Sequence, residues 1–217
     1  MPVQSRRIIT VLIADDHPAT LLGIRSILEK APDIRIVGEA VDGNQIQQLV
    51  AELRPNILLL DLKMPHLSPA ELEKWVRTNY PETITLVLTA HDRDAYLLNM
   101  MDAGVAGYLD KKLQAGQLIS AIQRAAHGEI LFDKEQMERA RRWRAEVALK
   151  WESLSERERE VLQLLTEGGD NKMIAASLGI AISTVEKHLA NIYNKLGLTS
   201  RAEATHWWIE KGMDFRN

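Results

Sequence analysis

The sequence contains no cysteine, which excludes disulfide bonds and thiolate metal sites. It also lacks a long apolar run, since no stretch approaches the roughly 20 residues that a membrane-spanning helix needs. A short apolar run follows Arg6 and Arg7 but ends in two aspartates, which favours a strand over a signal peptide. With neither an anchor nor a leader expected, we predict a cytoplasmic protein with no membrane partner.

The composition is that of a soluble globular protein, with 46% hydrophobic and 26% charged residues. A length of 217 residues has room for one large domain or two small ones. The net charge of -3 does not by itself indicate a nucleic-acid partner. Charge is uneven, however, because residues 133–150 hold 6 basic and 4 acidic side chains and form the only basic stretch.

The first 132 residues alternate short apolar runs with helical patterns. The expected strands are residues 8–14, 34–40, 57–60, 84–89 and 107–109. The expected helices are residues 19–30, 44–53, 69–79, 94–103 and 114–127. Five such units with short connections predict an α/β domain over residues 1–132, built as a doubly wound, five-stranded parallel sheet of the flavodoxin-like type.

Residues 133–150 predict a helical linker, because they are rich in Glu, Arg and Ala and contain no Gly or Pro. Asp133 and Gln136 could cap its start. Two interpretations stay open: a solvated helix lying on one domain, or a helix that dimerises or transmits a signal.

Residues 151–217 predict a small all-α helix-turn-helix domain. The expected helices lie near 155–167, 172–178, 183–196 and 201–211. Asn171 could cap one of them. Helix starts are marked by pairs that could form capping boxes: Ser68 with Glu71, Ser155 with Glu158, Ser183 with Glu186, and Ser200 with Glu203.

Three aspartates follow two of the expected strands. Asp15 and Asp16 come directly after the first strand, and Asp61 follows the third. Because the carboxyl ends of parallel strands meet at one edge of a sheet, these carboxylates should share a pocket. Like charges at that distance repel one another, so the pocket needs a hard cation such as Mg2+. A reactive aspartate beside a bound metal suits phosphoryl transfer.

Four short segments strengthen this interpretation, each at the end of a strand. They are Ala14-Asp15-Asp16-His17-Pro18, Asp61-Leu62-Lys63-Met64-Pro65, Thr89-Ala90 and Gly107-Tyr108-Leu109-Asp110-Lys111. Together and in this order they resemble the receiver domains of bacterial two-component response regulators. The resemblance covers the first half of the chain from end to end.

The resemblance implies a phosphoacceptor and a metal site. Asp61 would take a phosphoryl group from the phosphohistidine of a sensor histidine kinase. Asp15, Asp16 and Asp61 would hold Mg2+ together with the backbone carbonyl of Lys63.

Three further residues would serve the phosphorylated state. Lys111 would place a cation against the phosphoryl group, and Thr89 would donate a hydrogen bond to it. Tyr108 would swing inward once Thr89 moves, and so act with it as a switch. Simpler interpretations stay open, because Thr89 could be an ordinary strand residue, Lys111 a surface lysine, and Tyr108 half-buried packing.

The histidines near the pocket, His17, His66 and His91, are expected to be loop residues, because a carboxylate Mg2+ site needs no imidazole. Hydrolases that form an aspartyl phosphate carry a second aspartate two positions after the first. Lys63 occupies that position here and is a poor proton relay. We therefore expect no enzyme, but a protein that accepts a phosphoryl group and slowly autodephosphorylates.

Residues 154–212 resemble the LuxR-type helix-turn-helix domain of NarL/FixJ response regulators. The matching segments are Leu154 to Leu162, Asn171 to Ala175, Ser183 to His188, Asn191 to Gly197, and Arg201 to Ala204. A basic residue is common in the family where this chain has Glu186. A capping box with Ser183 is the interpretation that we favour for Glu186.

Periodicity assigns two faces to the helix that begins near Ser183. Val185, Leu189, Ile192 and Leu196 should face the core. The expected DNA-binding residues are Lys172, Thr184, Lys187, Asn191, Asn194, Lys195 and Arg201. Asn and Lys can read base edges in a major groove, whereas Lys172 and Thr184 suit backbone phosphates. Arg201 could instead pair with an acid, and His188 is expected to pack.

Two adjacent tryptophans, Trp207 and Trp208, lie on the chain's last expected helix. One of them could be exposed as an anchor for a second copy, or both could be partly buried against Trp151 or Tyr193. Because residues 151–217 carry a net charge of -2, one copy should bind double-stranded DNA weakly. We expect a homodimer on a pseudo-palindromic operator, with dimerisation controlled by phosphorylation. The alternative is a constitutive DNA-binding protein with an idle receiver.

Overall fold

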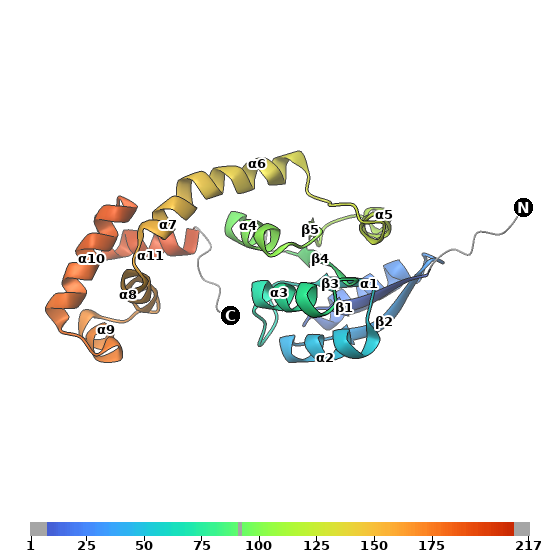
Figure 1. Cartoon of the computed structure of the whole chain (residues 1–217), viewed down its shortest axis with the longest axis horizontal. Coiled ribbons are helices and arrows are strands. Elements are labelled where there is room, and N and C mark those ends of the chain that lie inside the picture. Colours follow the sequence, from blue (N-terminus) through green and yellow to red (C-terminus); the bar gives the residue numbers. More distant parts are fainter. Residues whose placement is uncertain (1–7, 91–92, 211–217) are drawn as a thin grey trace, which may run out of the picture. The chain divides into compact units, whose positions relative to one another are not determined.

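The computed structural model describes residues 8–90 and 93–210, with side chains up to Trp208. The chain divides into two compact units, one ending at Met137 and the other beginning at Glu138 (Figure 1). The predicted linker, residues 133–150, straddles this division, and its role as a spacer stays a prediction. Across the described ranges, no helix combines the length and apolarity needed to cross a bilayer.

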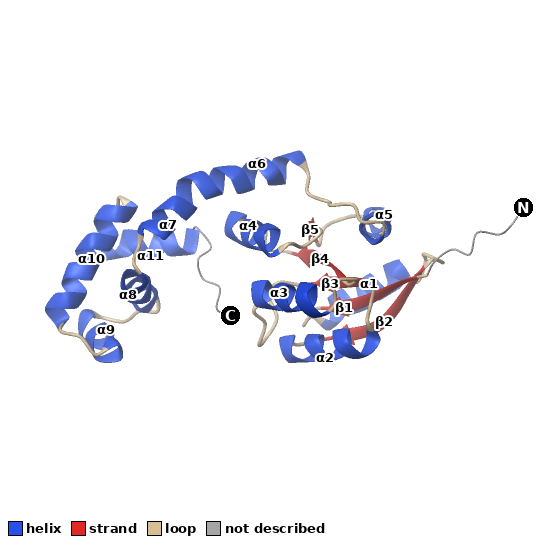
Figure 2. Cartoon of the chain, viewed as in Figure 1, coloured by secondary structure: helices blue, strands red, loops and turns tan. Residues whose placement is uncertain are grey.

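The first unit is built on a parallel sheet of five strands in the order β2-β1-β3-β4-β5 (Figure 2). The strands are β1 (Ile9–Ala14), β2 (Ile34–Ala40), β3 (Ile57–Leu60), β4 (Ile84–Thr89) and β5 (Gly107–Asp110). All four residues of β3 are buried, as expected of a strand covered on both faces. The predicted doubly wound α/β domain is confirmed.

Five helices cover the sheet. They are α1 (Pro18–Leu28), α2 (Gly43–Leu53), α3 (Pro69–Asn79), α4 (Asp94–Ala103) and α5 (Ala115–Ala126). Successive residues of β1 point to opposite faces. Ile13 therefore joins a core cluster with Leu28 of α1 and Ile122 of α5, whereas Leu12 joins one with Ile46 of α2.

The second unit is helical throughout its described part. From residue 149 on, its elements are α7 (Leu149–Ser153), α8 (Glu156–Thr166), α9 (Asn171–Leu178), α10 (Ile182–Leu196) and α11 (Arg201–Glu210). The helix predicted after residue 133 is present as α6 (Lys134–Trp143), a short π-helical segment η1 (Arg144–Ala148), and α7. Val185, Leu189, Ile192 and Leu196 of α10 are buried, as the periodicity predicts.

The predicted caps are confirmed at some helix starts and wrong at others. Ser155 and Glu158 form a reciprocal capping box at α8. Asp170, rather than Asn171, caps α9 by accepting a hydrogen bond from Met173 N at 2.8 Å. Ser68 precedes α3 but makes no capping hydrogen bond with its side chain.

Two predicted capping boxes in the second unit need correction. Ala181 is the N-cap of α10, which places Ser183 inside the helix, and the predicted box with Glu186 is wrong. The helix begins early because the carbonyl of Ala181 accepts the first hydrogen bonds, from Thr184 N at 2.9 Å and Val185 N at 3.2 Å.

At α11, Ser200 Oγ accepts a hydrogen bond from Glu203 N at 3.1 Å, as predicted. The Glu203 carboxylate does not return to Ser200, however, but accepts from Thr199 N at 2.7 Å. The reciprocal half of this cap is therefore shifted by one residue.

Trp207 and Trp208 are both buried, so the predicted exposed anchor is wrong. The rings of Trp208 and Trp151 meet edge to face, with their centroids 5.7 Å apart. The competing interpretation had both residues partly buried against Trp151 or Tyr193, and the structure supports it for Trp208, which packs on Trp151.

Candidate functional site

The carboxyl edge of the sheet brings four predicted site residues together. Asp15 follows β1 and Asp61 follows β3, while Thr89 ends β4 and Lys111 follows β5. The register between the strands pairs Thr89 with Asp110, and Lys111 N donates to Thr89 O at 3.1 Å. Residues that lie far apart in the sequence therefore converge because parallel strands share an edge.

Lys111 joins the two buried carboxylates. Its Nζ lies 2.7 Å from Asp15 Oδ2 and 2.8 Å from Asp61 Oδ2, and both aspartates are buried. Burial alone would lower the pKa of Lys111, but hydrogen bonds to Asp15 and Asp61 outweigh it, and the pKa ends above its usual value. The lysine is therefore a fixed cation in the pocket.

Backbone N–H groups fix the remaining oxygens of these two carboxylates. Asp15 Oδ1 accepts a hydrogen bond from His17 N at 2.9 Å, and Asp61 Oδ1 accepts one from Leu62 N at 2.9 Å. Such bonds hold a side chain in one rotamer. The pocket is therefore organised before any ligand arrives.

The donor set fits a hard divalent cation. Ligand atoms of Asp15, Asp16, His17 and Asp61 all lie within 4.8 Å of one another. Asp16 Oδ1 is buried and makes no hydrogen bond, although His17 Nδ1 approaches it to 2.7 Å outside hydrogen-bonding geometry. Oxygen ligands of this kind suit Mg2+, so the three carboxylates could hold it.

His17 was expected near the pocket as a loop residue, but its contact with the aspartates was not predicted. Its side chain is exposed, as expected of a loop residue, but its ring lies against Asp16 and 3.4 Å from Asp15 Oδ1. The available signal was its position directly after the aspartate pair. His66 is also an exposed loop residue, whereas His91 lies outside the described residues.

Three further residues predicted for the pocket, Thr89, Lys63 and Tyr108, differ in their environments. Thr89 is almost fully buried at the end of β4, and Lys63 is half-buried in the loop after β3. Tyr108 is buried in a cluster with Val87, Leu97 and other apolar residues. Its ring is thus already inside the protein, while its role as a switch stays a prediction.

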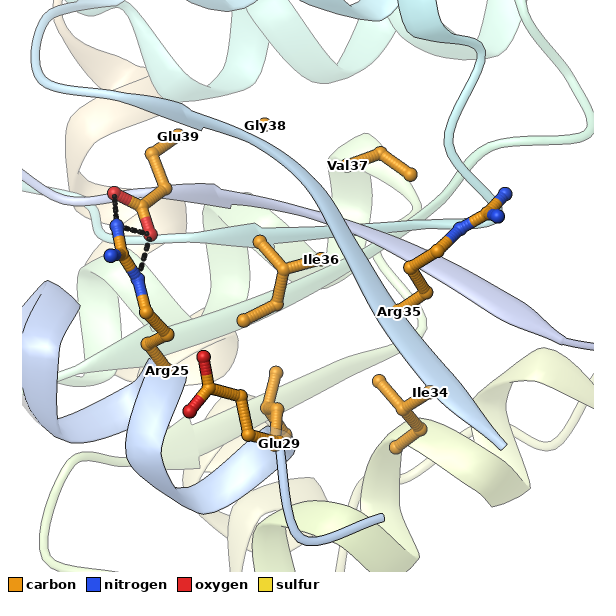
Figure 3. Close-up of a pocket in the computed structure, with 9 residues that line it drawn as sticks. Arg25, Glu29, Ile34, Arg35, Ile36, Val37, Gly38 and Glu39 are labelled. Carbon is orange, nitrogen blue, oxygen red and sulfur yellow. Dashed lines mark hydrogen bonds and ion pairs between the residues drawn. The ribbon is translucent and has the colours of Figure 1, made fainter. Parts of the chain in front are cut away.

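A separate pocket in this unit has no group of reactive side chains comparable to the carboxylate cluster. It has a volume of about 640 Å³ and lies along α1 and β2 (Figure 3). Its main polar feature is the ion pair between Arg25 and Glu39, whose closest nitrogen–oxygen distance is 2.7 Å (Figure 3). The carboxylate cluster is therefore the stronger candidate for a reactive site.

In the second unit, α10 presents a polar surface opposite its buried stripe. Lys187, Asn191 and Asn194 are exposed, and Thr184 is half-buried in the first turn. Lys172 is exposed at the start of α9. These side chains stand where the sequence places them, and their contacts with DNA stay a prediction.

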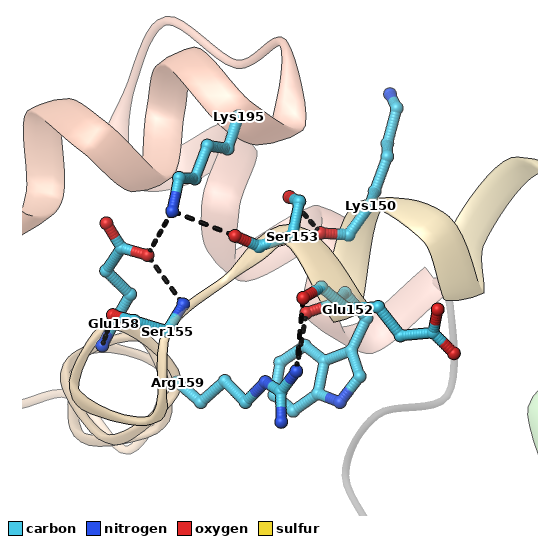
Figure 4. Close-up of polar contacts among 8 residues, drawn as sticks. Lys150, Glu152, Ser153, Ser155, Glu158, Arg159 and Lys195 are labelled. Carbon is cyan, nitrogen blue, oxygen red and sulfur yellow. Dashed lines mark hydrogen bonds and ion pairs between the residues drawn. The ribbon is translucent and has the colours of Figure 1, made fainter.

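Two of the predicted DNA contacts already have partners within the unit, and Lys195 is the first of them (Figure 4). Its Nζ donates to Glu158 Oε2 at 2.7 Å and to Ser153 O at 2.8 Å. Glu158 is buried, and burial alone would raise its pKa, but Lys195 and Ser155 outweigh burial and lower it. This pair ties α10 to the start of α8.

Arg201 is engaged within the unit as well. It donates to Asn171 Oδ1 at 3.3 Å and closely to Gly169 O, so it joins α11 to the turn before α9. The partners of Arg201 are thus a backbone carbonyl and a side-chain amide, whereas the sequence had suggested an acid. Glu186 is exposed on α10, and His188 is half-buried, as expected of a packing residue.

Comparisons with known proteins assign each of the two units to a family. Residues 11–123 match the family model "Response regulator receiver domain", and residues 152–208 match "Bacterial regulatory proteins, luxR family". The chain is 34% identical over 196 residues to response regulator protein VraR of Staphylococcus aureus, which covers 90% of this chain and 94% of that protein.

Solved structures of RcsB are also similar over both units. RcsB of Salmonella enterica serovar Typhimurium, bound to promoter rprA in the presence of the phosphomimetic BeF3-, aligns with a TM-score of 0.58 and 27% identity, over 92% of this chain and 98% of that one. A structure of two RcsB dimers bound to two parallel DNAs aligns with a TM-score of 0.61 and 27% identity, over 94% and 98%.

Proposed function

Because the chain belongs to the response regulators that join a receiver domain to a LuxR-type DNA-binding domain, we propose that it is a transcription regulator switched by phosphorylation of Asp61. The observation that carries this is the contact of Lys111 Nζ with both Asp15 and Asp61, at 2.7 and 2.8 Å. A fixed cation beside a buried acceptor carboxylate is what phosphoryl transfer requires.

A phosphohistidine of a sensor kinase is the donor. An oxygen of Asp61 attacks phosphorus, the phosphorus–nitrogen bond breaks, and its electron pair stays on the imidazole of the kinase. Lys111 offsets the charge on the transferred group, and Thr89 donates its hydroxyl hydrogen to a phosphoryl oxygen. Mg2+ held by Asp15, Asp16, Asp61 and the carbonyl of Lys63 supplies Lewis-acid charge neutralisation when bound.

The output is a dimer on DNA. Lys195 and Arg201 both have partners within the second unit, which leaves few cations for phosphate in one copy. Two copies on paired half-sites double the contacts and impose a spacing on the operator. Phosphorylation, through Thr89 and Tyr108, shifts the population towards the dimer. The structure of RcsB bound to promoter DNA in the presence of the phosphomimetic BeF3- supports a DNA-bound form of the phosphorylated state.

Sedimentation of the full-length protein tests the switch. With Mg2+ and beryllofluoride, the wild-type protein should shift towards the mass of a dimer and bind promoter fragments more tightly. Asp61→Asn should do neither. An equal shift in both proteins would show that the pocket is not the switch.

Two other functions predict different results. Tight, unchanged DNA binding by the unphosphorylated protein would indicate a constitutive regulator. Sustained turnover of a small phosphoester would indicate a hydrolase, whereas Lys63 favours only slow autodephosphorylation.

A further inference from the structure

The chain leaves the first unit along the outer edge of β5. Because β5 is the last strand in the sheet order, one row of its backbone groups has no neighbouring strand. Leu131 N donates to Ala106 O at 2.6 Å, and Leu131 pairs with Gly107 in a parallel bridge. Further along, Gln136 Nε2 donates to Tyr108 O at 2.7 Å. We call residues 131–136 the exit segment: Leu131 pairs with the outer edge of β5, and the first turn of α6 meets the same strand through Gln136.

The exit segment also reaches the core on both faces of the sheet. Leu131 packs against the cluster that contains Leu88 and Ile122. Phe132, the next residue, packs against the cluster that contains Tyr108. Adjacent side chains of an extended chain point to opposite faces, which explains the division. The segment is thus fixed to β5 by its side chains as well as its backbone.

Gln136 joins this edge to the start of α6. Its Oε1 accepts a hydrogen bond from Asp133 N at 3.1 Å, and its own backbone N donates to Asp133 Oδ1 at 2.8 Å. That exchange is a reciprocal helix cap. It leaves Nε2 to donate to Tyr108 O, so a single amide holds both the helix start and the strand.

We propose that Gln136 is a positioning residue that couples β5 to α6, so that a change at the phosphorylated pocket moves the helix leading to the DNA-binding unit. The proposal rests on the proposed function. Tyr108 lies three residues before Lys111, on a strand of 4 residues. A displacement of this strand must therefore either carry the first turn of α6 with it or break the bond to Gln136.

Two variants separate the bond to the strand from the cap of the helix. Gln136→Glu keeps an acceptor for Asp133 N but replaces the donor to Tyr108 O with an oxygen. Asp133→Ala removes the capping carboxylate and leaves the Gln136 donor in place. Asp133 is exposed and Gln136 is half-buried, and circular dichroism will confirm that both proteins fold.

The measurement is the gain in affinity for promoter DNA when the full-length protein receives Mg2+ and beryllofluoride. Wild type and Asp133→Ala should show the same gain. In Gln136→Glu the gain should fall roughly three- to tenfold, as expected for one hydrogen bond, with the affinity of the unphosphorylated protein unchanged. An undiminished gain in Gln136→Glu would overturn the coupling, as would an equal loss in both variants. A wild-type protein without any gain would overturn the proposed function itself.

Discussion

Lys195 donates a hydrogen bond to Glu158 at 2.7 Å, across 37 residues of sequence. The lysine stands on the exposed stripe of α10 and was predicted to contact DNA, yet its partner is the buried carboxylate that also caps α8. An ion pair between a buried acid and a lysine on the surface of α10 stabilises the packing of α10 on α8. Removing either member leaves the other unpaired.

This relationship separates two lysines on the same helix. Lys187→Ala should weaken DNA binding and reduce the slope of log affinity against log salt by about 1, because one positive charge facing the duplex is lost. Lys195→Ala should instead lower the free energy of unfolding by roughly 1–3 kcal/mol, because Glu158 loses its partner. Salt-dependent fluorescence anisotropy and urea unfolding of both variants will test this. A reduced salt slope with unchanged stability in Lys195→Ala would contradict it.

The pocket lysine should be important for stability as well as for signalling. Lys111→Met leaves Asp15 and Asp61 facing each other without a cation, at a cost of roughly 3–5 kcal/mol in the free energy of unfolding. Mg2+ should recover part of that loss, since it neutralises the same carboxylates. Urea unfolding with and without MgCl2 measures both effects. Lys112→Met, an exposed neighbour, is the control and should resemble wild type.

Asp16 should contribute to metal binding but little to folding. Its buried Oδ1 makes no hydrogen bond, so Asp16→Asn removes the negative charge without breaking a hydrogen bond at that oxygen. We expect at least a tenfold weaker affinity for Mg2+ by calorimetric titration, on the order of 1.4 kcal/mol. Phosphorylation by a small phosphodonor should slow in parallel. Asp110→Asn, an exposed change at the same edge of the sheet, should leave Mg2+ affinity intact.

Glu73 should make the stability of the first unit depend on pH. Burial raises the pKa of Glu73 from 4.5 to about 7, although Thr85 and Arg77 act in the opposite direction. A carboxyl group with a raised pKa holds its proton more tightly when folded. Its contribution is therefore complete below pH 4.5 and is lost as the pH rises through 7.

The expected loss in the free energy of unfolding is up to about 3 kcal/mol. Glu73→Gln should remove this pH dependence and be more stable than wild type at pH 8. Urea unfolding of wild type and variant across this pH range measures the difference. Glu71→Gln, on the exposed side of the same helix, should keep the wild-type profile. Identical profiles for all three proteins would show that Glu73 does not titrate in this range.

The sequence by itself determined the elements and the edge where the site forms. Apolar runs and helical periodicity predicted five strands and their helices to within a residue or two. The carboxyl ends of parallel strands lie at one edge of the sheet, so polar residues that follow the strands come together there. The convergence of Asp15 and Asp61 was therefore predictable from the strands, and the resemblance to receiver domains added Lys111. The buried stripe of α10 was predictable too, because a period of 3.6 residues assigns faces locally.

Only the tertiary structure decided which partners those faces meet. Lys195 pairs with Glu158, Trp208 packs on Trp151, and Gln136 reaches Tyr108, each through contacts between elements that are distant in sequence. Periodicity predicts whether a side chain points outward or inward, but it does not predict which residue the side chain contacts. The start of α10 at Ile182 was likewise decided by the structure. The backbone carbonyl of Ala181 accepts the first hydrogen bonds of the helix, and no pattern of side chains indicates this.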